Sequence, residues 1–140
     1  MNIIEYFAAQ NKEYWLSQIA ESDWSAAHFL HYLLKENKLF DLVGKCTRVL
    51  MLVEGDKLIS FCTLAEKDDV QPTDLTPWIG WIYTFPTYRG KGFARELISR
   101  AEELAKSDGA THTYISTNHI GLYERYGYEL LGMMKDIEGE

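Results

Sequence analysis

The residues best suited to binding an anion are grouped in one run, FPTYRGKGFA, at positions 85–94. Gly90 and Gly92 let the backbone come close to a ligand, and Arg89 and Lys91 add two positive charges. The run lies between an expected strand and an expected helix, where the first backbone N–H groups have no partner within the helix. These donors and the positive end of the helix dipole predict a site for a polyphosphate such as pyrophosphate.

The spacing of this run differs from that of two other phosphate-binding loops. The Walker loop requires GxxxxGK followed by Ser or Thr, which this turn lacks. The dinucleotide fingerprint GxGxxG is matched only at Gly90 and Gly92, because Arg95 stands where the third small residue is required. Taken alone, the run is also compatible with a basic turn that binds nothing.

Two motifs, about 30 residues apart, resemble those of one family. Arg89-x-x-Gly92-x-Ala94 resembles (Gln/Arg)-x-x-Gly-x-(Gly/Ala), the acyl-CoA-binding signature of the GNAT superfamily of N-acyltransferases. The run LYERYGYE at 122–129 is similar to the family's common LYEKxGFE segment. The resemblance is strong over residues 47–135, and over 1–45 it rests on two expected helices.

The resemblance implies an N-acetyltransferase that moves an acetyl group from acetyl-CoA to a primary amine, by direct attack of the amine on the thioester. The backbone of Tyr83, Thr84 and Phe85 would pair with the pantetheine arm, and a strand N–H there could hold the thioester oxygen as it becomes negative. Asn118 would make a polar contact with the cofactor. Six residues would hold the pyrophosphate through their amides and side chains: Arg89, Gly90, Lys91, Gly92, Phe93 and Ala94.

Tyr123 is the general acid that the resemblance implies, and it would protonate the leaving coenzyme A thiolate. A thiol has a pKa of about 8.5 and a phenol one of about 10, so complete proton transfer would be uphill by roughly 2 kcal/mol. Donation while the C–S bond breaks is therefore the favoured picture. An aromatic ring packed under the sheet is the alternative for Tyr123, and Tyr126 and Tyr128 are expected in the core.

The general base is left open by the sequence. An amine with a pKa near 10.4 is mostly protonated at pH 7, and deprotonating it costs about 4–5 kcal/mol. Many members of the family place Glu on or beside the strand that reads WIGWIY here, at 78–83, and this strand has no acid. The groups that could act through water are His119 and four carboxylates of the loop over 66–77: Glu66, Asp68, Asp69 and Asp74.

The charge of the chain is distributed unevenly. Fourteen Lys and Arg against 21 Asp and Glu give a formal net charge of −7, which argues against nonspecific binding to nucleic acid or to an acidic membrane. Residues 86–107 are the positive segment, with five basic and three acidic residues. The acid elsewhere, in the 66–77 loop above all, favours a cationic acceptor, either a small molecule or a peptide. Seven aromatic residues either line that acceptor or belong to the core: Tyr14, Trp15, Trp24, Phe29, Tyr32, Trp78 and Trp81.

Length and composition predict one soluble globular domain over 1–140, because 46% of the residues are hydrophobic and 25% are charged. No apolar run approaches the roughly 18 residues of a membrane span, and no secretory signal is visible, so we expect a cytoplasmic protein. Cys46 and Cys62 lack CxxC spacing, and the four histidines form no ligand pattern. We therefore expect reduced thiols and no metal.

The helices and strands that must position these residues are expected in the order α-α-β-β-β-α-β-α-β. Gly55-Asp56 predicts a tight hairpin, and Gly44 and Gly109 predict helix ends. The fold class is α/β (α+β): a single GNAT-like domain with a mixed, mostly antiparallel sheet flanked by helices, whose last edge could be covered in a homodimer. The expected helices cover 8–21, 26–43 (capped by Ser25), 92–107 and 119–126, and the expected strands cover 47–53, 58–65, 78–85, 111–117 and 128–135.

Two other hypotheses stand beside the N-acetyltransferase. A non-catalytic acyl-CoA-binding or sensor module of the same fold is favoured by the missing strand carboxylate, whereas Tyr123 in its expected place favours the enzyme. A structural protein with an incidental basic turn is the third. The sequence does not identify the acceptor amine.

Overall fold

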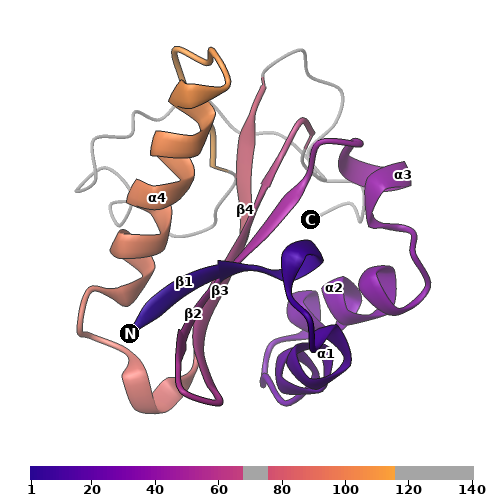
Figure 1. Cartoon of the computed structure of the whole chain (residues 1–140), viewed down its shortest axis with the longest axis vertical. Coiled ribbons are helices and arrows are strands. Elements are labelled where there is room, and N and C mark those ends of the chain that lie inside the picture. The colour runs from indigo at the N-terminus through magenta and orange to yellow at the C-terminus, as the bar shows by residue number, and fades with distance from the viewer. Residues whose placement is uncertain (68–75, 116–140) are drawn as a thin grey trace.

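The fold is taken from a computed structural model of the chain, which describes residues 1–67 and 76–115 (Figure 1). Its strands are β1 (Asn2–Glu5), β2 (Arg48–Glu54), β3 (Lys57–Ala65) and β4 (Trp78–Thr84). Its helices are α1 (Lys12–Ala20), α2 (Ser25–Lys35), α3 (Leu39–Val43) and α4 (Phe93–Ser107), with short 3-10 turns η1 (Tyr6–Ala8) and η2 (Pro86–Tyr88).

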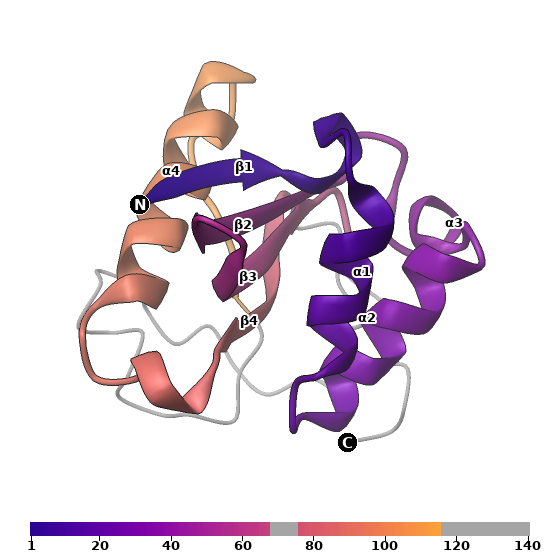
Figure 2. The ribbon, with the colours of Figure 1, turned by 60° about the horizontal axis from the view of Figure 1, so that its bottom comes forward.

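The four strands form one sheet in the order β1-β2-β3-β4, and each neighbouring pair is antiparallel. Glu54 pairs with Lys57 across the β2–β3 turn, where Gly55 has a φ of 62°, which confirms the predicted hairpin. Figure 2 shows α1 and α2 on one face of the sheet and α4 on the other. The sequence prediction of a largely antiparallel sheet flanked by helices is therefore confirmed.

Both faces of the sheet are buried, which explains the nearly continuous apolar runs of β2 and β3. Successive side chains of a strand point to opposite faces. Val49 and Met51 accordingly pack in the cluster with α1 and α2, while Leu50 and Leu52 pack in the cluster with α4. The α4 side of that second cluster consists of four buried residues: Leu97, Ile98, Ala101 and Ala105.

The first half of the chain differs from the predicted order, because it begins with a strand. β1 was not predicted, and its residues, Asn2–Glu5, become a strand by pairing with residues 50–53 of β2. The helix expected over 8–21 begins only at Lys12.

The helix expected over 26–43 is two helices, α2 and α3. Asn37 takes a left-handed φ of 56°, and Lys38 N–H donates to the Leu33 carbonyl at 2.8 Å. This is the Schellman arrangement that ends a helix, and asparagine tolerates it better than most residues do. Ser25 is the first residue of α2 rather than its cap, while Gly44 ends α3 as predicted.

The later elements are described in part. β4 and α4 fall where the sequence predicted them, but the strand expected over 111–117 is, in its described residues, a single parallel bridge from Tyr114 to Trp78. The helix expected over 119–126 and the strand expected over 128–135 lie outside the described residues. Within 1–67 and 76–115, no helix is long and apolar enough to cross a membrane.

Candidate functional site

The end of β4 is set by a bulge. Thr63 pairs with Gly80 and Phe61 with Tyr83, so three steps along β4 match two steps along β3. Trp81 lies in this extra length and has a φ of 46°, which a bulky residue rarely adopts. Its indole N–H donates to the Ala26 carbonyl at 2.7 Å, which fixes the bulge against α2. Bulges of this kind re-aim the residues that follow.

The backbone after the bulge is held on one side by β3. Phe85 N–H donates to the Ile59 carbonyl at 3.0 Å, and the Ser60 hydroxyl donates to the Tyr83 carbonyl at 2.6 Å. Because alternate residues of an antiparallel ladder point to opposite sides, the N–H and carbonyl of Thr84 point away from β3. This outward side of β4 is paired by Tyr114 at the start of the strand, where Ile79 N–H donates to the Tyr114 carbonyl at 2.8 Å.

The turn into α4 contains two glycines in the left-handed region and has no side-chain cap. Gly90 and Gly92 each have a φ of 80°, and a Cβ at either position would meet no heavy atom within 4 Å. The first ladder bond of α4 runs from Glu96 N–H to the Gly92 carbonyl at 3.2 Å, and Gly92 supplies no side-chain cap. The backbone N–H groups before Glu96 thus have no carbonyl partner in the ladder of α4, at the positive end of the helix. These residues fit a pyrophosphate.

Tyr83 joins β4 to the loop between α1 and α2. Its side chain is buried, with 5% exposed, and its ring stacks on Trp24 at a centroid distance of 5.8 Å. Its hydroxyl donates to Asp23 Oδ1 at 2.5 Å and accepts from the Asp23 N–H at 3.2 Å. Burial and this bond raise the pKa of the Tyr83 phenol, while the same bond lowers the pKa of the Asp23 carboxyl.

Arg89 lies against the same group of residues. Its Nε donates to the Thr84 carbonyl at 2.8 Å, and its Nη2 is 3.6 Å from Asp23 Oδ1. Its guanidinium carbon lies 5.4 Å from the centre of the Tyr83 ring. The guanidinium thus faces the end of β4, although half of the side chain stays exposed.

The structure brings the described part of the predicted donor site together, from Tyr83 to Ala94 at the β4–α4 junction. Asn118 and Tyr123 lie outside the described residues, as do the base candidates Asp68, Asp69, Asp74 and His119. Glu66 is described and follows β3 directly, beside the start of β4. Since β4 spans six steps of about 3.3 Å, roughly 20 Å of strand separate that position from the end of β4.

Two polar residues of this region, Asp23 and Ser60, were not predicted from the sequence. Asp23 is 60 positions from Tyr83 and stands between two expected helices with no motif around it. Ser60 lies inside an apolar strand, where its hydroxyl is within 2.9 Å of the Thr84 hydroxyl. The local sequence offers one indication of a role for Ser60, because it is a small polar residue within a mostly apolar strand.

The seven aromatic residues divide between core and surface. Trp15 and Trp78 are buried, as expected of core residues, whereas Tyr14 and Tyr32 are exposed. The remaining three, which pack partly buried on the α1–α2 side of the sheet, are Trp24, Phe29 and Trp81.

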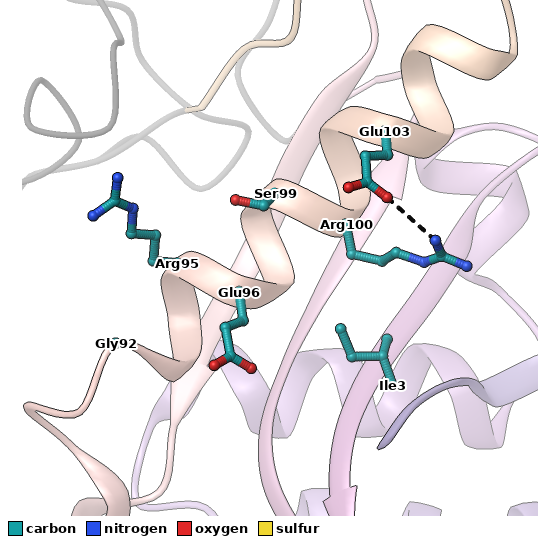
Figure 3. A pocket seen from close by; sticks show the side chains of 7 residues that line it. All are labelled: Ile3, Gly92, Arg95, Glu96, Ser99, Arg100 and Glu103. Carbon is teal, nitrogen blue, oxygen red and sulfur yellow. Dashed lines mark hydrogen bonds and ion pairs between the residues drawn. The ribbon is translucent and has the colours of Figure 1, made fainter. Parts of the chain in front are cut away.

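A surface depression of about 490 Å³ lies between β1 and the outer face of α4. Figure 3 shows its charged lining, in which Arg100 and Glu103 point toward each other at 3.3 Å. It shares Gly92 and Arg95 with the start of α4 but does not include Tyr83. Among the described residues, no group of three or more His, Cys, Asp or Glu side chains could hold a metal ion.

Solved structures share this fold. The crystal structure of a predicted acetyltransferase from Clostridium acetobutylicum, which contains acetyl-CoA, matches with a TM-score of 0.60 and 21% identity over 91% of this chain and 89% of that one. An aminoglycoside antibiotic 6′-N-acetyltransferase from Acinetobacter haemolyticus matches with a TM-score of 0.61 and 22% identity over 93% of this chain and 92% of that one.

The sequence is also similar to a longer protein and to one family. An uncharacterized protein of Saccharomyces cerevisiae is 29% identical over 107 residues, which are 73% of this chain and 26% of the yeast protein. The chain thus spans about a quarter of that relative. A family model described as Acetyltransferase (GNAT) family matches residues 6–128, which is most of the chain. Together with the turn and the bulged strand, this match shows that the chain belongs to the GNAT family of acetyltransferases.

Proposed function

We propose that this protein is an acetyl-CoA-dependent N-acetyltransferase that acetylates a primary amine. The observation that carries the proposal is the uncapped first turn of α4, open at Gly90 and Gly92, directly after the bulged β4 in a chain of this family. The acetyl-CoA found in the similar Clostridium acetobutylicum structure supports the choice of donor. Acetyl-CoA supplies the reactive thioester, and the protein's residues bind it, orient it and move protons.

Acetyl-CoA would be held by the backbone of two segments, the turn before α4 and the end of β4. The amides of Gly90 to Ala94, helped by the charge of Lys91, would bind the pyrophosphate, while Arg89 contacts the Thr84 carbonyl and Asp23 beside them. The strand end from Tyr83 to Phe85 would pair with the pantetheine arm. The outward-pointing N–H of Thr84 supports that part of the proposal, because β3 does not use it, whereas the Thr84 carbonyl accepts from Arg89 Nε. Asn118 would add a further polar contact.

The reaction would require one group that donates a proton to the leaving thiolate and one that accepts a proton from the amine. Tyr123 would protonate the thiolate as it leaves, and an amine must lose a proton before it attacks. β4 offers no carboxylate within Trp78–Thr84. The base would therefore act through water, from Asp68, Asp69, Asp74 or His119, because Glu66 lies beside the start of β4 and accepts from the Cys46 N–H there.

The acceptor would be a small-molecule or peptide amine, and the acidic body of the chain supports a cationic one. The Acinetobacter haemolyticus relative in fold is an aminoglycoside 6′-N-acetyltransferase by its description. For this chain we propose the wider class, a primary amine.

Calorimetry with acetyl-CoA and a thiol-release screen against amines test the proposal. Binding of acetyl-CoA followed by release of coenzyme A with one amine class is the expected result. Binding without release from any amine would favour the second candidate, a non-catalytic acyl-CoA-binding or sensor module, which the missing β4 carboxylate supports. Failure to bind acetyl-CoA would contradict both functions.

A further inference from the structure

Arg89 stands at the first position of the predicted anion turn, yet its three contacts lie on the protein side of that turn. They are the Thr84 carbonyl at 2.8 Å, Asp23 Oδ1 at 3.6 Å and the face of the Tyr83 ring at 5.4 Å. The first and third hold the turn to β4, and the second connects the turn to the loop between α1 and α2. These contacts attach the guanidinium to the protein in two places outside the turn.

Asp23 and Tyr83 are hydrogen-bonded to each other, and Arg89 contacts both of them. Tyr83 is buried, and the pair shares two hydrogen bonds, from the phenol to the carboxylate and from the Asp23 amide to the phenol. The tyrosine and the arginine both reach Oδ1 of Asp23. The side chain of Asp23 is 65% exposed, so its replacement should leave the fold intact.

We propose that Arg89 is a positioning residue, which holds the turn of residues 85–92 against the end of β4 and against Asp23 so that the amides of the turn face the donor. The inference rests on the proposed function only for the identity of the ligand, CoA. A direct phosphate ligand and a positioning residue make opposite predictions for two pairs of variants.

The first pair is Arg89→Gln and Arg89→Lys. Glutamine places Nε2 at the same distance along the side chain as arginine Nε, so it can still donate to the Thr84 carbonyl, although it carries no charge. Lysine keeps the charge but has a methylene at that point. We expect Arg89→Gln to keep its affinity for CoA within about threefold of wild type and Arg89→Lys to lose about tenfold, the effect of one hydrogen bond. The reverse order would overturn the proposal.

The second pair is Asp23→Ala and Asp23→Asn. Both remove a negative charge near the site of an anion, which on Coulombic grounds alone should strengthen CoA binding equally. Asparagine keeps an oxygen for Tyr83 and Arg89, whereas alanine removes it. We expect Asp23→Ala to weaken CoA binding about fivefold and Asp23→Asn to stay near wild type. Tighter binding by both variants would contradict the positioning role.

Amide hydrogen exchange of the ligand-free protein separates this inference from the proposed function. Tyr88 N–H donates to the Phe85 carbonyl at 2.9 Å and Arg89 N–H to the Pro86 carbonyl at 3.3 Å, so both amides report on the turn. They should exchange several-fold faster in Arg89→Lys and Asp23→Ala, and at the wild-type rate in Arg89→Gln. Unchanged exchange in all variants would overturn the inference. If wild-type protein binds no CoA, the proposed function fails, while the exchange rates still decide whether Arg89 holds the turn.

Discussion

The first residues of β4 lie between two backbones, whereas its last residues lie among polar side chains from distant parts of the chain. Ile79 is fully buried, pairs with Leu64 of β3 and donates to the Tyr114 carbonyl on the other side. Tyr83, only four residues further on, bonds to Asp23. The bulge at Trp81 separates the two ends, so one strand serves as core at its start and as a candidate binding edge at its end.

The two ends of β4 differ in how their backbone hydrogen bonds are satisfied and in how much backbone strain they contain. The start exchanges its backbone hydrogen bonds with neighbouring strands and buries apolar side chains, which is where most folding free energy arises. The end holds a bulky residue at positive φ and pairs on its outward side with an arginine side chain. Such costs persist where the surrounding structure compensates for them, and they cluster at functional sites. We therefore expect changes at the start to lower stability and changes at the end to lower function.

The largest expected effect is on turnover, from Tyr123→Phe. Removing the proton donor should lower kcat by about 10²–10⁴ and leave the affinity for acetyl-CoA near wild type, because that affinity belongs to the end of β4 and the turn. Thiol-release kinetics and calorimetry on the same protein measure the two quantities. Tyr126→Phe, three residues along and expected in the core, is the matched control and should keep wild-type kcat. A Tyr123→Phe enzyme with normal turnover would remove the acid role.

Ile79→Ala should have the largest effect on stability. The side chain is fully buried in the cluster beneath α4, and such truncations cost about 2–5 kcal/mol. Denaturant unfolding measures the loss, and CoA binding by the folded fraction should stay unchanged. A loss of CoA affinity beyond that of the folded fraction would show that the two ends of β4 are not independent.

Some of this arrangement was readable in the sequence. Gly55-Asp56 between two β-prone runs specifies the β2–β3 hairpin locally, and the helical spacing of Leu97, Ile98 and Ala101 specifies α4. The turn between β4 and α4 was predicted from its glycines, and Gly90 and Gly92 do take the left-handed conformation, while the binding of an anion there stays a prediction.

Other features could not be read because they depend on partners far away in the chain. β1 has four residues and becomes a strand only by pairing with β2. The bulge at Trp81 follows Gly80, and an isolated glycine in a strand is compatible with a bulge, but the bulge itself depends on the register against β3. The bond between Asp23 and Tyr83 spans 60 positions. In each case the stabilising contact is tertiary, so the local pattern does not determine it.

A smaller effect is expected from Gly92→Val compared with Gly109→Val. Both glycines have positive φ (80° and 98°), and at both a Cβ would meet nothing within 4 Å, so each substitution should cost about 1–2 kcal/mol of stability from the backbone alone. Only Gly92 lies at the anion turn. We expect Gly92→Val to lose at least about tenfold in CoA affinity and Gly109→Val to lose none. Equal affinities in calorimetry would show that no ligand approaches Gly92.

The smallest expected effect is a change in the slope of stability against pH, from Tyr83→Phe. Burial first, and then the Asp23 carboxylate, raise the pKa of the Tyr83 phenol above its ordinary value of about 10. The unfolded chain therefore loses this proton at a lower pH than the folded protein does. The stability contributed by the neutral phenol is fully present below pH of about 10 and is lost as the pH rises through the folded pKa.

Thermal unfolding between pH 8 and pH 11 measures that slope in wild type and in Tyr83→Phe. The variant should melt at a lower temperature at pH 8, because the bond to Asp23 is gone, but its Tm should fall less steeply above pH 10. Tyr6 and Tyr14, the other tyrosines with raised pKa in the described part of the chain, are present in both proteins, as is every tyrosine outside that part, so the difference between the curves isolates Tyr83. Parallel curves would mean that Tyr83 titrates alike in the folded and unfolded chain, and the polar end of β4 would then owe its order to Arg89 and the bulge rather than to the phenol.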